Sequence, residues 1–123
     1  MDCLFCNLAN NNGNYIYEDE KVVAFLDINP VCNGHTLIMP KEHILNTLDT
    51  DLSNHIKEVI KKLYPMYQEK LGCTGLTIVT NCDSAQAIKH YHVHMIPRYN
   101  NDGIDFNKQE NLLDVNEVLN KLK

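Results

Sequence analysis

The sequence has no hydrophobic run that approaches the roughly 18 residues needed to span a bilayer. Residues 1–6 lack the basic region and the apolar stretch that make a secretory signal peptide. The five cysteines are an odd number, which does not fit a fully paired disulfide framework. Together these absences predict reduced thiols and a cytoplasmic location.

Basic residues are also in deficit. Lys and Arg number 11 against 16 Asp and Glu, and the formal net charge is −5 at pH 7. Broad electrostatic binding to nucleic acid or to anionic membranes needs clustered Lys and Arg, so we expect neither partner. A ligand that carries phosphate would have to be recognised by a local site, because the overall field of the protein repels it.

Several segments are rich in β-prone residues and are bounded by turn residues. The predicted strands are residues 15–18, 22–27, 35–39, 75–80 and 90–97. The first two form a predicted hairpin, in which Val23, Phe25 and Asp27 share one face. The polar run 10–14 is predicted to be a surface loop.

Two segments carry helical signals. Apolar residues recur at helical spacing over residues 52–71, with Asp51 as the expected N-cap and Gly72 as the expected stop. Pro65 has no backbone N–H to donate, so it is expected to kink this helix or to end its regular part. A short C-terminal helix is expected after Asp114.

The strands do not alternate with helices along the chain. This order predicts an α+β fold: an antiparallel sheet of about five strands with one long helix and one short C-terminal helix. We expect a single domain over residues 1–123, with its core at about residues 3–105 and a polar loop and helix over 106–123.

The run His90-Tyr91-His92-Val93-His94 alternates three histidines with hydrophobic residues. Alternate side chains of a strand share a face, so the three imidazoles are expected together and Tyr91, Val93 and Met95 are expected to face the core. Three titratable rings at this spacing repel one another when protonated. They fit three alternatives: capping of nearby carbonyl groups, a metal site, or nucleophilic catalysis by one neutral imidazole that its neighbours orient.

Continued by Met95 and Ile96, this run fits the pattern His-φ-His-φ-His-φ-φ, where φ is hydrophobic, and in it the sequence resembles the histidine triad (HIT) family. Other segments resemble the bacterial branch of that family, in the same order over about the first hundred residues. They are Cys3-Leu4-Phe5-Cys6, Tyr17-Glu18-Asp19, and residues 24–30, 34–43 and 97–98. The resemblance implies the HIT fold and a homodimer that pairs the sheets of two copies.

The resemblance also implies a reaction: hydrolysis or nucleotidyl transfer at the α-phosphate of purine nucleoside phosphoramidates, acyl-nucleotides or dinucleoside polyphosphates. His92 would be the nucleophile and would form a covalent nucleotidyl-histidine intermediate that water hydrolyses. His94 would contact the phosphate and help to protonate the leaving group. His90 would hold His92 in place or serve a metal, and His35 would fix the tautomer of the nucleophile. No organic cofactor is implied.

Nucleotide contacts follow from the same resemblance. Asp27 matches the acid that binds the ribose hydroxyls, and Asn81 and Gln86 match polar residues that contact the phosphate or the leaving group, Gln86 with a catalytic role. The apolar slot for the base would be lined by Phe5, Leu8, Phe25 and Ile28. The sequence departs from the family pattern over residues 81–87, a shorter segment with Ala85 in place of a glycine and no hydroxyl at Ala87.

Cys3 and Cys6 are spaced Cys-x-x-Cys. Taken alone, the pair fits a redox dithiol, two unconnected thiols, or half of a zinc site. Through the resemblance, His43 and His90 would complete a structural Cys2His2 zinc site that joins the N-terminus to the sheet.

The leading hypothesis is therefore a HIT-family hydrolase that acts on phosphoramidate or phosphoanhydride bonds of nucleotides. The alternative from another class is a purine-nucleotide-binding or sensing module with negligible turnover. A thiol or metal redox protein would require a reversible disulfide between Cys3 and Cys6.

Overall fold

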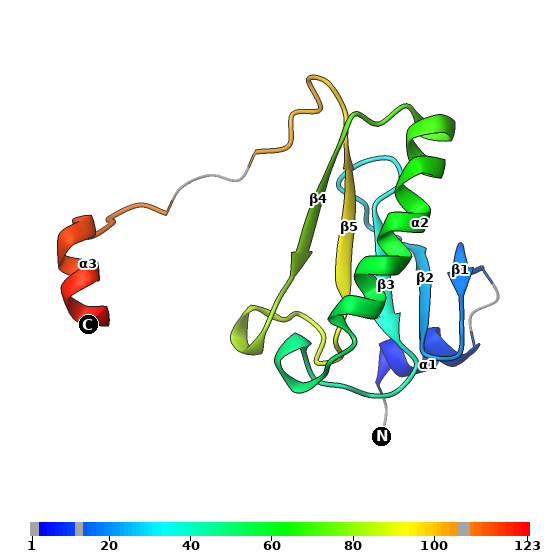
Figure 1. The fold of residues 1–123 in the computed structure, drawn as a ribbon, viewed down its shortest axis with the longest axis horizontal. Helices are drawn as coiled ribbons and strands as arrows, with labels where there is room; N and C mark the ends of the chain where they lie inside the picture. Colours follow the sequence, from blue (N-terminus) through cyan, green and yellow to red (C-terminus); the bar gives the residue numbers. More distant parts are fainter. Residues whose placement is uncertain (1–2, 12–13, 106–108) are drawn as a thin grey trace.

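The computed structural model describes residues 3–11, 14–105 and 109–123. The strands are β1 (Tyr17–Glu18), β2 (Val22–Leu26), β3 (Thr36–Pro40), β4 (Gly75–Thr80) and β5 (Val93–Arg98). The helices are α1 (Leu4–Asn11), α2 (Ser53–Leu71) and α3 (Val115–Leu122), with short 3-10 turns η1 (Thr47–Asp49) and η2 (Asp83–Ala85). Figure 1 shows α2 lying across the sheet and α3 standing apart from it. No described helix is long and apolar enough to cross a membrane.

In the described part of the chain, the strands form one five-stranded antiparallel sheet in the order β1-β2-β3-β5-β4. The predicted α+β class with an antiparallel sheet is therefore confirmed, and so is the hairpin, in which Tyr17 pairs with Ala24. The central pair, β3 and β5, has a register that places Leu37 opposite His94. This register brings His35, just before β3, beside the histidine segment.

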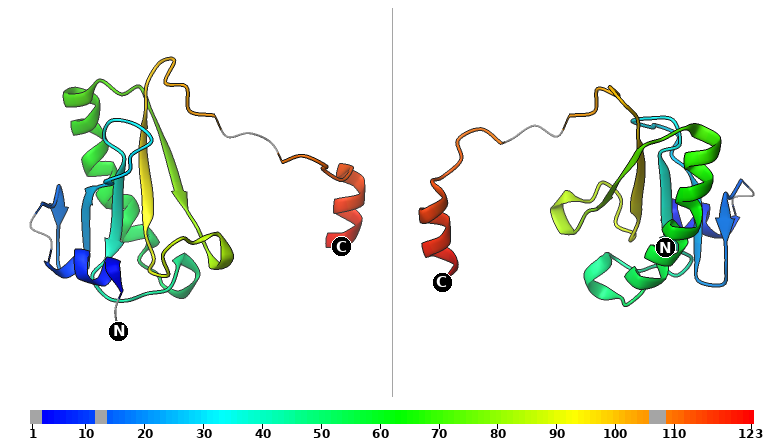
Figure 2. Two further views of the ribbon diagram at one scale, coloured as in Figure 1. Left: turned by 180° about the vertical axis from the view of Figure 1, so that it is seen from behind. Right: turned by 45° about the horizontal axis from the view of Figure 1, so that its top comes forward.

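The sheet has a helix on each face, and the views from the front and from behind show α2 and α1 respectively in front of it (Figures 1 and 2). On the α2 face, Val22 and Ala24 pack in one buried cluster with Ile56 of the helix. On the α1 face, Val23 and Phe25 belong to a second buried cluster. The predicted alternation of side chains along β2 is thus confirmed, and the core has two layers.

Helix α2 differs from the prediction at its start and at its proline. The N-cap is Leu52 and not Asp51, and no side chain of Leu52 caps the helix. The Leu52 carbonyl accepts the first helical hydrogen bond, from the backbone N–H of Ile56. The helix does not end near Pro65 but continues to Leu71. Gly72 ends it as predicted, with a left-handed φ of 74° that favours glycine.

Helix α1 was not predicted, and it corrects the expected loop over residues 10–14. Asn10 lies within the helix and donates its side-chain N–H to the carbonyls of Cys6 and Lys41, at 2.8 and 3.1 Å. Residues 12–13 lie outside the described residues. The helix therefore runs to Asn11, and its last turn is joined to the end of β3.

Strand β5 begins at Val93, so the prediction of a strand from His90 is wrong at its start. The backbone N–H of Tyr91 donates to the Ile44 carbonyl (2.6 Å), and the Pro40 carbonyl accepts from Nε2 of His90 (2.9 Å). The Tyr91 N–H and the Pro40 carbonyl therefore do not pair with each other, and the hydrogen bonds between β3 and β5 do not extend to residues 90–92. The alternation nevertheless continues through the irregular part. Tyr91 and Val93 lie in the cluster on the α2 face, as predicted.

The predicted C-terminal helix is present as α3, and a carboxylate oxygen of Asp114 accepts the backbone N–H of Asn116 at its start. None of its residues is buried. The large apolar side chains of this segment are exposed: Leu112, Leu113, Val115, Val118, Leu119 and Leu122.

Candidate active site

A cavity of about 590 Å³ opens on the α1 face of the sheet. Its apolar wall comes from α1 (Leu4, Phe5, Leu8), from β2 and the turn after it (Phe25, Leu26, Ile28), and from Leu37. Its polar groups are Asp27, Asn29, Asn81, His92 and His94, and Ala85, Ala87 and Ile88 close the remaining side. No Lys or Arg of the described residues lines it. The sequence-predicted nucleotide contacts thus meet in one cavity, except for Gln86.

His92 is held in one tautomer by the backbone. Its Nδ1 lies 2.7 Å from the carbonyl oxygen of His90. A carbonyl only accepts hydrogen bonds, so Nδ1 carries the proton and Nε2 carries a lone pair. The ring is 6% exposed and lines the cavity. His92 therefore combines burial with an Nε2 lone pair that has no hydrogen-bond partner among the described residues.

His94 is held in the opposite tautomer by a chain of hydrogen bonds. The backbone N–H of Val31 donates to Nδ1 of His35 (3.2 Å), so the proton of His35 is on Nε2. That Nε2 lies 3.0 Å from Nδ1 of His94 and donates to it. The proton of His94 is then on its own Nε2. The rings of His92 and His94 are 5.0 Å apart, so a lone pair and an N–H donor stand side by side.

His35 and His94 are neutral at pH 7. Burial, together with repulsion from His92 and His35, lowers the pKa of His94 to about 4. Burial also lowers the pKa of His35, although Asp27, with Oδ2 3.6 Å from its Nε2, opposes the shift. The structure places the ring of His35 against His94 and not, as the sequence suggested, against the nucleophile candidate His92.

The amide of Gln86 is turned away from the cavity. Its Nε2 donates to the carbonyl of Leu45 (2.7 Å), and its buried Oε1 has no hydrogen-bond partner among the described residues. The preceding residues form the turn η2, in which Asp83 has a left-handed φ of 56° and its carbonyl accepts from the ammonium of Lys89. The shortened segment therefore presents the methyl groups of Ala85 and Ala87 to the cavity.

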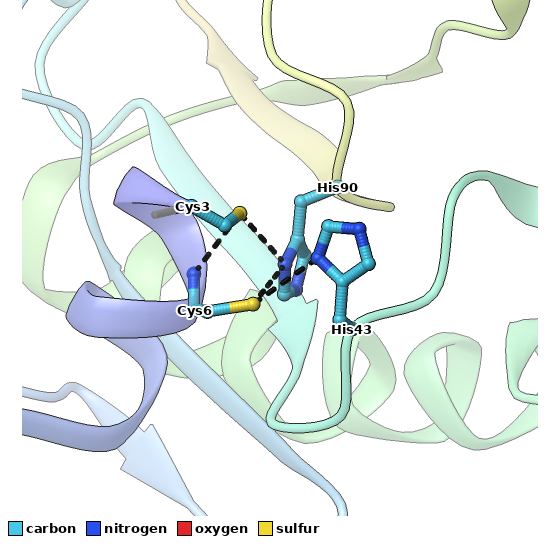
Figure 3. Close-up of side chains that lie close together, drawn as sticks. All are labelled: Cys3, Cys6, His43 and His90. Carbon is cyan, nitrogen blue, oxygen red and sulfur yellow. Dashed lines mark hydrogen bonds between the residues drawn. The ribbon is translucent and has the colours of Figure 1, made fainter. Parts of the chain in front are cut away.

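The four sequence-predicted metal ligands also meet (Figure 3). Nδ1 of His90 lies 3.6 Å from Sγ of Cys3 and 3.4 Å from Sγ of Cys6, and Nδ1 of His43 lies 3.1 Å from Sγ of Cys6. Nε2 of His90 donates to the Pro40 carbonyl (2.9 Å), so its lone pair is on the nitrogen that faces the thiols. This tautomer and the Cys2His2 donor set fit a tetrahedral metal.

A second group of possible ligands, Asp27, His35 and His94, lies at the edge of the cavity, which Asp27 and His94 line. Here the tautomers oppose metal binding. The hydrogen bond from Val31 puts the proton of His35 on Nε2, the nitrogen that faces the other two residues. A metal ligand needs a lone pair at that position, so the donor chain and a metal exclude each other.

Helix α1 and the N–H of Val31 are the parts of the site that sequence reasoning missed. A signal for the helix exists: Cys3 and Cys6 are three apart, and Phe5, Leu8 and Ala9 follow the i, i+3, i+4 spacing of one helical face. The contact with Val31 has no sequence signal, because a backbone N–H is present at every residue except proline.

Comparisons with known proteins show which family this chain resembles. A model of the HIT domain matches residues 9–101. An uncharacterised HIT-like protein of Methanocaldococcus jannaschii is 42% identical over 98% of this chain and 98% of its own length. Adenylylsulfatase HINT3 of Arabidopsis thaliana is 31% identical over 82% of this chain and 54% of its own length.

Solved structures give the same result for the fold. A zinc-bound histidine triad family protein from Mycobacterium smegmatis has a TM-score of 0.78 and 32% identity, covering 90% of this chain and 85% of that one. A hypothetical histidine triad nucleotide-binding protein from Sulfolobus tokodaii has a TM-score of 0.73 and 35% identity, covering 98% and 88%. Both are therefore similar to this chain in overall fold.

We predict that the ring of His94 stays neutral until the pH falls to about 4. The unfolded chain takes up this proton near pH 6.5, so the free energy of unfolding should decrease as the pH falls from about 6.5 to 4. Side-chain ¹⁵N shifts of histidine, followed across this range and assigned with His94→Asn, measure the pKa. Titration of His94 near pH 6.5 would contradict the buried donor chain.

Proposed function

This chain belongs to the HIT domain family, and on that premise we propose that it is a nucleotide hydrolase or nucleotidyl transferase. Its substrates would be purine nucleoside phosphoramidates, acyl-nucleotides or dinucleoside polyphosphates, cleaved at the α-phosphate. The observation that carries the proposal is the pair of opposite tautomers, a lone pair on His92 beside an N–H on His94. The relative from Arabidopsis named an adenylylsulfatase, and the one from Sulfolobus named nucleotide-binding, support it.

The chemistry follows from the two rings. Nε2 of His92 attacks the α-phosphorus, the new N–P bond forms, and the bond to the leaving group breaks with its electron pair on the leaving group. The N–H of His94 donates to the phosphate and helps to protonate the departing atom. Water then cleaves the nucleotidyl-histidine and restores His92. The Nδ1–H bond to the His90 carbonyl stabilises the charge that develops on the attacking ring.

The residues that line the cavity also favour binding of a nucleoside on the α1 face of the sheet, the face that carries His92 and His94. Phe5, Leu8, Phe25 and Ile28 offer an apolar slot for the base, and 91% of the Ile28 surface is exposed and available for contact. Asp27 would accept hydrogen bonds from both ribose hydroxyls. Its carboxylate is positioned for this by the backbone N–H of Asn29, 2.9 Å from Oδ1.

We predict that His92→Asn loses turnover of an adenosine phosphoramidate by about 10³-fold or more and still binds AMP. Asparagine keeps a polar group of similar reach but has no lone-pair nitrogen. The matched control is His55→Asn on α2, whose ring bonds to Asp19 outside the cavity and which should retain turnover. Stopped-flow kinetics and calorimetry measure the two effects. Full turnover by His92→Asn would reject the nucleophile.

A purine-nucleotide-binding or sensing module with negligible turnover is the second candidate. The segment 81–87 favours it, because Gln86 turns away and the methyl groups of Ala85 and Ala87 offer the leaving group no hydrogen bond. Mass spectrometry of protein quenched during turnover separates the two: a nucleotidyl adduct on His92 supports the enzyme, and its absence with tight AMP binding supports the module.

We also propose a structural zinc ion held by Cys3, Cys6, His43 and His90. The donor set, the tautomer of His90 and the zinc-bound relative from Mycobacterium smegmatis support it. Two thiolates and two neutral imidazoles balance the charge of Zn²⁺, and the ion would join α1 to the end of β3. The free thiols favour a reducing compartment such as the cytoplasm.

Protein purified without chelator should contain about one zinc per chain, because the four ligands satisfy tetrahedral coordination. The double variant Cys3→Ser, Cys6→Ser should lose the metal, since hydroxyl groups are poor zinc ligands. Cys82→Ser, which removes a thiol outside the cluster, should keep it. Elemental analysis gives the ratio, and wild-type protein with less than about a tenth of an equivalent would sink the zinc proposal.

We propose further that residues 1–123 form one domain that pairs with a second copy along β4. This strand is the long edge of the sheet, with six residues against two in β1, and its residues include neither a charge nor a proline. Ile78 on β4 is half-exposed. The chain after β5 carries α3 beyond the β4 edge in all three views, where a second copy would meet its apolar face (Figures 1 and 2).

The full chain should therefore have twice the 14.1 kDa chain mass in solution. Leu119→Asp places a charge on the apolar face of α3 and should weaken the dimer by about tenfold or more, since a buried leucine contributes about 1.5–3 kcal/mol. Asn120→Asp adds the same charge at the neighbouring, polar position and should leave the dimer intact. Light scattering over a dilution series measures both, and a monomeric wild type would reject the pairing.

A further inference from the structure

Helix α1 contributes to the metal cluster and to the nucleotide cavity at once. Cys3 and Cys6 lie against His90 in the cluster, whereas Phe5, between them, lines the cavity. The ring of Phe5 is 6% exposed and meets the ring of His92 edge-on, with centroids 4.8 Å apart and an interplanar angle of 87°. The same turn of the chain thus carries the two thiols and a direct contact with the nucleophile candidate.

His90 makes the second connection. Its Nδ1 faces the two thiols and its Nε2 donates to the Pro40 carbonyl. Its backbone carbonyl accepts the Nδ1 proton of His92 at 2.7 Å. The residue is fully buried, so a displacement of its ring by loss of a ligand cannot be absorbed by solvent and must move its neighbours.

We infer that Phe5 and His90 are positioning residues, through which occupancy of the Cys3/Cys6/His43/His90 cluster by a divalent metal sets the competence of His92. The inference rests on the proposed function, and it adds a regulation to it. Metal binding fixes α1 and His90, and these fix the nucleophile ring and one wall of the base slot. Without the metal, α1 is an eight-residue helix with no intrinsic stability of its own.

The effect is positional and not electrostatic. Metal loading releases the two thiol protons, and the two thiolates cancel the double charge of the ion. The net charge beside the cavity is therefore the same in the loaded and empty states, and the attraction for a nucleotide phosphate does not change. Loss of the metal instead lets the Phe5 ring and the His90 carbonyl move. The fraction of His92 molecules in the Nδ1–H tautomer then falls.

The test compares full-length protein stripped of metal with the same protein after stoichiometric zinc. In loaded protein, the side-chain ¹⁵N spectrum of His92 should show the Nδ1–H tautomer alone. In stripped protein it should show a mixture of tautomers, and the Kd for AMP should rise by about tenfold. An unchanged tautomer and an unchanged Kd in folded, metal-free protein would overturn the inference.

Two matched variants, both studied with zinc bound, test the role of Phe5 even if the metal-free protein unfolds. Phe5→Leu keeps all four ligands and should bind zinc normally, yet it should mix the tautomers of His92 and lower kcat by about tenfold. Phe25→Leu makes the same change on β2, where the ring meets Tyr15 instead of His92, and should raise KM while His92 keeps the Nδ1–H tautomer alone. Wild-type kcat and a single tautomer in Phe5→Leu would reject Phe5 as a positioning residue.

Failure of the inference and failure of the proposed function give different results. Loaded wild-type protein that binds no AMP and forms no nucleotidyl adduct would refute the proposed function. The tautomer of His92 is read without any nucleotide, so the connection between metal and ring is judged independently of the substrate.

Discussion

The hydrogen bond between Nδ1 of His92 and the His90 carbonyl is the contact on which the rest of the site depends. It joins two residues that are two positions apart, and both lie before the first residue of β5, Val93. Were His92 paired within the sheet, that carbonyl would serve a neighbouring strand, and the ring would be free to adopt either tautomer. A local irregularity in the backbone thus defines which nitrogen faces the cavity.

The second ring depends on a backbone group as well. The N–H of Val31 sets His35, and His35 sets His94, so each tautomer is traced to a peptide group that cannot titrate. Burial keeps His94 and His35 uncharged, which prevents the repulsion that neighbouring imidazolium rings would have. The cavity therefore presents an acceptor on His92 and a donor on His94, on rings whose centroids are 5.0 Å apart.

Much of this arrangement is predictable from the sequence, and the limits have physical causes. The class of fold, the helix over residues 52–71 and the faces of Val23 and Phe25 follow from periodicity, which burial enforces. The four residues of the metal cluster are predictable from the resemblance to the HIT family and from the preference of zinc for thiolate and imidazole ligands. The missed parts depend on partners distant in sequence. The turn of Gln86 toward Leu45 and the contact of His35 with His94 are set by how segments meet, which periodicity does not encode.

His90 uses its side chain for one neighbour and its main chain for another, and the two can be separated by mutation. Replacement of the imidazole removes a ligand but leaves the carbonyl in place, so the acceptor for His92 survives in every L-amino acid whose backbone keeps this conformation. A chain that lost its metal site could therefore retain a working nucleophile, provided that apolar packing took over the ordering of the first helix. The metal site and the orientation of the nucleophile are neighbours in the structure, but a related chain can keep the second without the first.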